Sequence, residues 1–155
     1  MLKAAAVLAL VFLAPATAMA QSYASLRSGD VNMRTGPGAR YPTSWVWQKA
    51  GEPFEVLANY ENWVKVRASD GTTGWFLRTT LSRRRTFKVI TPHILRRGPD
   101  DKTVAVARVE KGVIGAIRSC AAGSAWCRVQ YSEGVSGFVK RSDIWGVNPD
   151  EAIKE

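Results

Sequence analysis

A short turn motif occurs twice in this chain, and this repetition constrains the fold more than any other feature. The run VNMRTGPGARYP at 31–42 places an arginine before a Gly-Pro turn, and HILRRGPDD at 93–101 repeats the arginine, the glycine and the proline. Further matches follow in the same order at an offset of 61 to 63 residues: Gly51 with Gly112, Trp63 with Trp126, Gly71 with Gly134, Gly74 with Gly137, and Leu81 with Ile144. An ordered series at a nearly constant offset is an internal repeat, and two copies cannot form a solenoid. The sequence therefore predicts a tandem pair of similar domains.

Each copy has the pattern of short β-strands separated by turns. The expected strands are rich in β-branched and aromatic residues and lie at 45–49, 53–59, 62–68 and 73–76 in the first copy, and at 104–110, 113–119, 126–131 and 135–139 in the second. Between two of them, Gly71 can take positive φ and return the chain as a hairpin. No long amphipathic helical pattern occurs. Five strands in about 60 residues suffice for a small barrel, so we expect an all-β protein.

The first twenty residues have the pattern of a signal peptide. Lys3 precedes the apolar run Ala4–Leu13, and Ala18-Met19-Ala20 offers small residues for cleavage. The alternative is a membrane anchor, but the apolar run is shorter than the ~20 residues that cross a bilayer. We expect a signal peptide at 1–20, no stable membrane insertion, and export across the inner membrane, with the periplasm as destination.

The expected mature chain is strongly basic. Without Lys3, the 22 Lys and Arg residues become 21 against 13 acidic residues, and the formal charge falls from +9 to +8. Such a charge favours attraction to anionic surfaces. In an exported protein these surfaces are envelope polymers and lipid head groups, so we expect a cell-wall polymer or an envelope protein as partner and not a nucleic acid.

The two cysteines favour a structural bond over catalysis. Cys120 and Cys127 flank AAGSAW, where a hairpin can bring them face to face, and exported two-cysteine chains usually close a disulfide. A loop this short would restrict the unfolded chain by roughly 2–3 kcal/mol. The catalytic alternative needs a thiolate beside a base, and His93 is the sole histidine.

Other chemical motifs are not evident in the sequence. The carboxylates are scattered, and Glu52 and Glu55 cannot share a face of a strand. No phosphate-binding loop or nucleophile elbow occurs. We expect no catalytic residues, no metal site and no cofactor.

Six tryptophans exceed what two small cores require. Trp45 and Trp47 alternate with Val46, so both rings lie outward if Val46 faces the barrel interior. Outward rings near Arg34, Tyr41 and Trp75 would form a patch suited to sugars or peptides. The alternative is that these rings pack on the loop or on the second barrel.

The segment between the two copies is basic, and the chain ends in an acidic segment. Arg83, Arg84 and Arg85 could attract phosphates or carboxylates, or they could form a solvated linker that pairs with the neighbouring barrel. The final residues, NPDEAIKE at 148–155, are expected at the surface or frayed.

The motifs together resemble the bacterial SH3-like domain. The first copy carries N-x-R-T-G-P-G followed by Tyr-Pro, V-W-x-x-K, N-W-x-x-V and D-G-T-x-G-W. The pattern is similar to small exported proteins with two such domains, which implies two barrels with a binding role rather than catalysis. The second copy departs from it at Ile94, Asp100 and Phe138, so the resemblance places any binding groove more safely on the first domain.

The sequence therefore predicts two tandem SH3-like barrels, at 25–82 and 88–147, joined by a basic linker at 83–87 and followed by an acidic tail at 148–155. The expected function is noncatalytic binding in the cell envelope, to peptidoglycan or another anionic component. The alternative is a periplasmic adaptor that holds an extended peptide in the aromatic groove of the first domain.

Overall fold

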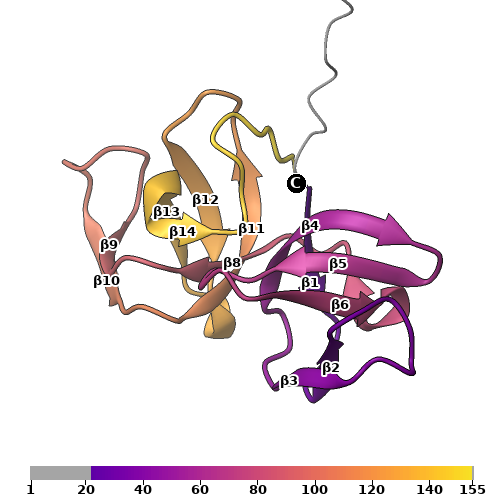
Figure 1. The fold of residues 1–155 in the computed structure, drawn as a ribbon. Helices are drawn as coiled ribbons and strands as arrows, with labels where there is room; N and C mark the ends of the chain where they lie inside the picture. The colour runs from indigo at the N-terminus through magenta and orange to yellow at the C-terminus, as the bar shows by residue number, and fades with distance from the viewer. Residues whose placement is uncertain (1–21, 155) are drawn as a thin grey trace, which may run out of the picture.

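The computed structural model describes residues 22–154, and within this range the chain forms two seven-stranded antiparallel sheets (Figure 1). The expected signal peptide at 1–20 lies outside the described residues. The remaining elements between residues 22 and 154 are single 3₁₀ turns. The prediction of an all-β protein with two tandem domains is confirmed.

The first sheet has the strand order β3-β2-β6-β5-β4-β1-β7. Its elements are β1 (Ser22–Leu26), β2 (Val31–Arg34), β3 (Thr43–Trp47), β4 (Pro53–Tyr60), β5 (Trp63–Arg67), β6 (Thr73–Leu77), the 3₁₀ turn η1 (Arg78–Thr80) and β7 (Leu81–Ser82).

The second sheet repeats this topology with the order β10-β9-β13-β12-β11-β8-β14. Its elements are β8 (Thr86–Val89), β9 (His93–Arg96), β10 (Ala105–Val109), β11 (Ile114–Cys120), β12 (Trp126–Gln130), η2 (Ser132–Gly134), β13 (Ser136–Lys140), η3 (Arg141–Asp143) and β14 (Ile144–Trp145). Thr86 and Phe87, which the sequence places in the linker, open β8.

Each sheet curls around its own core. The first core contains Phe54 and Phe76, whose ring centroids are 5.0 Å apart at an interplanar angle of 77°. The second contains Phe87, which meets Tyr131 edge to face at 5.3 Å. Such edge-to-face pairs are favoured by the charge distribution of aromatic rings. The two clusters share no residue, so each copy of the repeat buries its own apolar side chains.

Seven strands form in each barrel where the sequence predicts five. The strands beyond the four ranges expected for each copy are short: β1 has five residues, β2, β8 and β9 have four each, and β7 and β14 have two each. They lie beside the turn motif and at the two ends of each copy, where the alternation of apolar and polar residues is too brief to be recognised.

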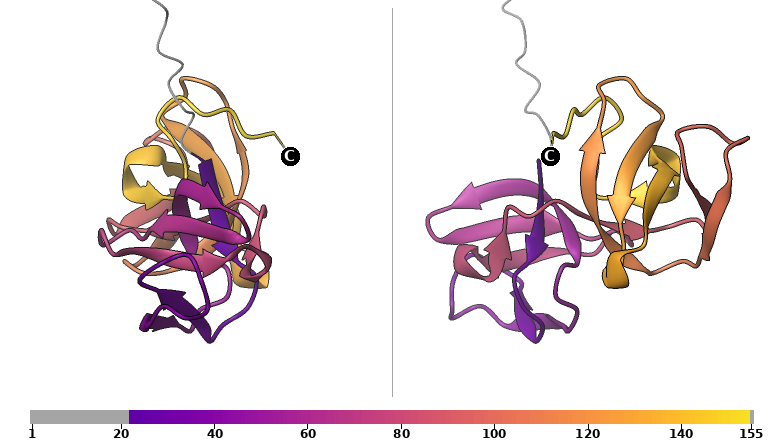
Figure 2. Two further views of the ribbon diagram at one scale, coloured as in Figure 1. Left: turned by 45° about the vertical axis from the view of Figure 1, so that its right-hand side comes forward. Right: turned by 180° about the vertical axis from the view of Figure 1, so that it is seen from behind.

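The two barrels lie side by side and touch through a few specific contacts (Figure 2). Tyr23 of β1 meets Trp145 of β14 edge to face, with ring centroids 5.5 Å apart. Lys88 Nζ of β8 lies 2.6 Å from Glu52 Oε1, in the turn before β4. The linker between β7 and β8 is short, because it spans only residues 83–85. It passes beside the contact between the domains, where Arg85 lies 5.8 Å from the ring centroid of Tyr23.

Candidate binding groove

The arginine of the repeated motif closes its own loop in both barrels. Arg34 Nη1 donates to the carbonyl oxygen of Tyr41 at 2.8 Å, and Arg96 Nη1 donates to that of Thr103 at 2.8 Å. The backbone N–H of the next residue in each copy also donates to a carbonyl seven residues on, at 3.0 and 2.9 Å. The motif recurs because each barrel needs this closure, and Arg34 has a structural task besides any contact with a ligand.

Tyr41 packs on the Gly-Pro-Gly turn of the same loop. A Cβ atom on Gly36 would lie 2.4 Å from Tyr41 Cδ1, so this position has no room for a larger residue. The guanidinium of Arg40 lies 5.7 Å from the centroid of the Tyr41 ring, within the range of a cation–π contact. The ring is half-buried in its own loop, and its contribution to ligand binding stays a prediction.

Trp45 and Trp47 point to the barrel side of β3, and Val46 points to solvent. Trp45 is paired with the buried Met33 and Trp47 with the buried Val31. Directly paired residues of an antiparallel ladder share a face. The condition under which both rings would lie outward is an inward Val46. It is wrong, because Val46 is paired with the exposed Asn32 and lies on the face of β3 opposite to Trp45 and Trp47.

The tryptophans of this region nevertheless differ in burial. Trp47 meets Phe54 edge to face at 4.8 Å and borders the first core. Trp45 is 59% exposed because the outermost strand extends past the core. Trp75 is half-buried and is paired in register with Arg34. We use the name aromatic face for the predicted set Arg34, Tyr41, Trp45 and Trp75. Arg34 is bonded to the Tyr41 carbonyl and paired with Trp75, whereas Trp45 is paired with Met33 and so lies on the other side of β2. The structure therefore does not bring Trp45 together with the other three.

The three linker arginines separate into different environments. Arg85 forms a two-pronged ion pair with Glu151, in which Nη2 and Oε2 are 3.0 Å apart, and it lies 5.8 Å from the ring centroid of Tyr23. Arg84 borders a cavity between the two barrels. Arg83 is exposed and lines a groove on the first barrel together with Arg85. The triplet therefore does not act as a single charged patch.

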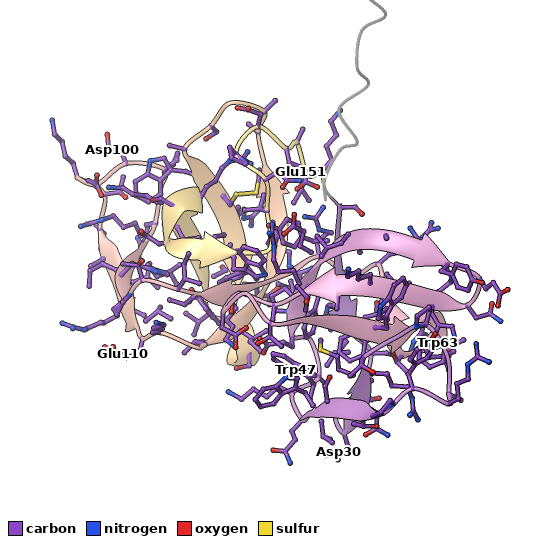
Figure 3. All side chains as sticks on the ribbon, in the orientation of Figure 1. Asp30, Trp47, Trp63, Asp100, Glu110 and Glu151 are labelled. Atoms are coloured by element: carbon purple, nitrogen blue, oxygen red, sulfur yellow. A yellow bond between two sulfur atoms is a disulfide. The ribbon has the colours of Figure 1, made fainter. Side chains whose placement is uncertain are left out.

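This groove has a volume of about 860 Å³, and we call it the arginine groove. Four of its lining side chains are arginines and none carries a carboxylate. The lining residues are Ser22, Tyr23, Ala24, Arg27, Val56, Asn59, Val64, Arg78, Thr79, Leu81, Ser82, Arg83 and Arg85. The groove thus combines an apolar floor from β1, β4, β5 and β7 with a cationic rim. Figure 3 shows how side chains fill the space between the two barrels beside it.

The groove presents donors to an incoming ligand. Arg27 Nη2 donates to the Leu81 carbonyl at 3.2 Å, and Arg78 Nη1 donates to Asn59 Oδ1 at 3.0 Å. These bonds hold each arginine side chain in place. Because a guanidinium has five N–H groups, further donors remain for a ligand. Burial, followed by the negative charge of Glu55, raises the pKa of Tyr23 to about 12, so its hydroxyl is also a neutral donor.

Two buried carboxylates went unrecognised in the sequence. Glu52 is 2% exposed and pairs with Lys88 of the other barrel. Glu55 is 1% exposed, and its Oε2 accepts from Arg67 Nε at 2.8 Å and from Nη2 at 2.6 Å. Both carboxylates are bound to cations at separate places, so they do not form a paired acid/base site.

The two cysteines form the predicted disulfide, Cys120–Cys127, with Cα atoms 4.4 Å apart. Since both sulfurs are bonded to one another, no thiolate is available beside His93, whose Nε2 lies 3.3 Å from the Tyr131 hydroxyl. Among residues 22–154, no three His, Cys, Asp or Glu side chains gather as metal ligands would. Nor does that part of the chain contain a helix of the length and hydropathy that crossing a membrane requires.

The described part of the tail lies at the surface of the second barrel and is attached to it, which agrees with the first of the two expected alternatives, surface or frayed. Ile153 N–H donates to the Cys120 carbonyl and Cys120 N–H donates to the Ile153 carbonyl, both at 2.9 Å. Glu151 accepts from Arg85 and from the N–H of Asn148. Since Arg85 lines the arginine groove, the tail passes the edge of that groove at Glu151.

Comparison with known proteins gives a clear family match. The family model for the bacterial SH3 domain matches residues 27–83 and again residues 91–146. No curated protein matches the chain.

Two of the solved structures with some similarity are NlpC2 from Trichomonas vaginalis and an NlpC/P60 family protein from Bacillus cereus ATCC 10987. NlpC2 has a TM-score of 0.35 and 13% identity, over 83% of this chain and 49% of its own. The Bacillus protein has a TM-score of 0.33 and 16% identity, over 80% of this chain and 56% of its own. The chain spans about half the length of these proteins.

Proposed function

The chain belongs to the bacterial SH3 domain family, and from this premise we propose that it is a noncatalytic binding module of the cell envelope. It contacts peptidoglycan or another anionic envelope component through the arginine groove of the first barrel. Export by the signal peptide at 1–20 and a periplasmic location are part of the same proposal.

The observation that carries the proposal is the composition of the arginine groove. Arg27, Arg78, Arg83 and Arg85 surround an apolar floor, and no lining residue has a negative charge. Guanidinium groups bind carboxylates and phosphates through paired hydrogen bonds of fixed geometry. The net charge of the expected mature chain, +8 after removal of Lys3, draws an anionic polymer toward this surface.

A noncatalytic role is supported by the state of the groups that could react. The cysteines are joined to each other, and the buried Glu52 and Glu55 are each bound to a cation. A groove of arginines holds an anion but supplies no nucleophile or general base at neutral pH.

Sedimentation with purified sacculi tests the proposal. The chain from residue 21 onward should pellet with sacculi at low salt and remain increasingly in the supernatant as the salt rises, because the Debye length shrinks to about 10 Å at 0.1 M. The double variant Arg27→Gln/Arg83→Ser should reduce binding at low salt at least about fivefold, as the loss of two charged contacts implies.

A matched control separates the groove from the overall charge. The double variant Arg97→Ser/Lys102→Gln removes the same charge from exposed positions of the second barrel and should bind as the unaltered protein does. If the two double variants lose equal affinity, or if the unaltered protein stays in the supernatant, the proposal fails.

The aromatic face supports a second candidate function, a periplasmic adaptor that holds an extended peptide. The observation in its favour is the exposure of Trp45, at 59%, on β3, which lies at the edge of its sheet. Exposed edge strands with apolar side chains can accept an added strand. Trp45→Ala should then abolish capture of an envelope protein while sacculus binding is unchanged. Unchanged capture by Trp45→Ala, together with loss of sacculus binding in Arg27→Gln/Arg83→Ser, assigns function to the arginine groove.

A further inference from the structure

The arginine groove has a counterpart in the second barrel, and the counterpart is filled. The repeat pairs Val56 with Ile117, Val64 with Cys127, and Arg78 with Arg141, at offsets of 61 and 63 residues. In the first barrel these positions line an open groove. In the second barrel the chain's own C-terminal segment, residues 147–154, lies at these positions: Arg141 donates to the Asn148 carbonyl, and Val147 and Ile153 pack in and against the core that contains Ile117 and Cys127.

The tail joins the edge of the second sheet through a single antiparallel β-bridge. The backbone of Ile153 forms an antiparallel bridge with that of Cys120, through two hydrogen bonds of 2.9 Å. Nearer the start of the tail, Arg141 Nη1 donates to the Asn148 carbonyl at 2.7 Å. Val147 is 8% exposed within the second core, and the side chain of Ile153 packs against the same core.

In the first barrel the chain takes a different course from the equivalent point. Ser82 occupies the position of Trp145, and the chain then leaves as the linker instead of folding back. Asn59 is equivalent to Cys120, because Asn59 is paired with Val64 as Cys120 is with Cys127. The Cα atoms of Cys120 and Cys127 lie 4.4 Å apart, the spacing of a pair that exchanges no backbone hydrogen bonds, so Cys120 directs its N–H and C=O away from Cys127. The equivalent pairing gives Asn59 the same direction, away from Val64. Within residues 22–154, no segment outside its hairpin forms a backbone hydrogen bond with Asn59.

The apolar side chains on the floor of the first groove are more exposed than their counterparts in the second barrel, as expected where no added segment covers them. Val56 is half-buried, whereas its counterpart Ile117 is 6% exposed in the core against which Ile153 packs. Leu81 is 8% exposed, against 4% for its counterpart Ile144. An apolar side chain in the place of Ile153 would complete this burial.

The rim of the first groove is more basic than the filled one. Arg27 and Arg83 stand where the second barrel has Ile90 and Gly146, at an offset of 63 residues. The tail that fills the second groove is itself acidic, and its Glu151 already binds Arg85 at the edge of the first groove. Charge complementarity therefore selects an occupant with carboxylates.

We infer that the arginine groove binds an extended acidic segment of a partner protein by strand addition at Asn59, in the manner in which the second barrel binds its own tail. The segment carries a carboxylate toward Arg27 and Arg83 and a branched aliphatic residue over Val56. This rests on the proposed function for the location of the site, and it specifies the class of partner.

A synthetic peptide with the tail sequence GVNPDEAIK, residues 146–154, is the probe. Titrated into the ¹⁵N-labelled chain from residue 21, it should shift the amide signals of Asn59 and its neighbours in a saturable manner. The amides of Cys120 and Ile153 should not move, because the tethered tail competes at an effective concentration in the mM range.

Two altered peptides test the mode of binding. Replacing Ile153 by proline removes the N–H that strand addition requires and should weaken binding at least tenfold. Changing Asp150 and Glu151 to amides should weaken it severalfold and remove most of its dependence on salt. In the protein, Arg83→Ser should weaken binding severalfold, whereas Arg97→Ser, with the same change of charge at an exposed site on the second barrel, should not.

Several results would overturn the inference. These are an absence of shifts at millimolar peptide, equal binding of the proline peptide, and shifts confined to the aromatic face. Sedimentation with sacculi, run with the same variants, separates the two claims. Loss of sacculus binding in Arg27→Gln/Arg83→Ser without any peptide binding refutes strand addition and leaves the proposed function standing. Peptide binding at Asn59 without sacculus binding supports the inference and refutes the proposed contact with peptidoglycan.

Discussion

The ion pair between Glu52 and Lys88 should couple the stability of the two barrels. Glu52 Oε1 lies 2.6 Å from Lys88 Nζ, and the side chains are 2% and 24% exposed. Removing one member of a fully buried pair costs about 3–5 kcal/mol, because the other charge is left without compensation. Because the two side chains differ in exposure, replacing Lys88 should cost a different unfolding free energy from replacing Glu52.

Lys88→Met should be the more damaging change, by about 2–3 kcal/mol of unfolding free energy, since the Glu52 carboxylate cannot reach water. Glu52→Leu leaves an ammonium group on a flexible side chain that is already partly exposed, and it should cost about 1 kcal/mol. The double variant removes both charges and should lie within about 1 kcal/mol of the unaltered protein, well short of the sum of the single changes.

Urea unfolding followed by tryptophan fluorescence measures these values, since each barrel contains tryptophans. Lys88→Met should also separate the unfolding of the first barrel from that of the second, because it weakens their contact. Lys102→Met, at an exposed position, serves as the control and should shift stability by less than about 0.5 kcal/mol. The reasoning is refuted if Glu52→Leu costs more than Lys88→Met, or if the double variant equals the sum.

Three further predictions concern local features. Replacing Cys120 and Cys127 by serine should lower the unfolding free energy by about 2.5 kcal/mol, the chain-entropy value for so short a loop, as urea titration will show. Burial opposes the charge of Glu151, but hydrogen bonds from Arg85 and the Asn148 N–H, with the nearby arginine charges, outweigh it and lower its pKa below 4.5. The tail contact is therefore complete above about pH 4.5 and weakens as the pH falls through the lowered pKa, which amide exchange at Ile153 should follow. Gly36→Ala should cost about 1–3 kcal/mol in thermal unfolding, because its Cβ would meet the Tyr41 ring at 2.4 Å.

Features determined by neighbouring residues could be predicted from the sequence. The expected strand at 62–68 is β5, and the one at 126–131 is β12, within one or two residues at each end. Gly71 has the positive φ expected of its turn, at 88°. The disulfide was predictable for the same reason, because the spacing of its cysteines alone brings them together across a hairpin.

Features determined by distant segments could not be predicted. Glu52 is buried because Lys88, 36 residues later, reaches it from the other barrel. The side of β3 on which Trp45 and Trp47 lie depends on the register of β3 with β2. The alternation of residues within β3 alone is compatible with either side. The arginine groove combines residues from β1, β4, β5 and the linker, so no continuous motif marks it.

The difference between the two copies decides which barrel can bind an outside ligand. In the second barrel, Cys120 is held both by the disulfide and by its bridge to Ile153, so a ligand must first displace a tethered strand. A tether that keeps its segment at millimolar effective concentration lowers the apparent affinity of a competitor by the ratio of that concentration to the tail's own dissociation constant. In the first barrel, Asn59 and Val64 replace the cysteines and no segment within residues 22–154 returns as the tail does, so none of these residues competes with a partner for the groove. Binding of an outside ligand is therefore expected in the first barrel, which lacks the disulfide and the attached tail. The reason is that no tethered segment competes with the ligand there, and not that any single contact is stronger.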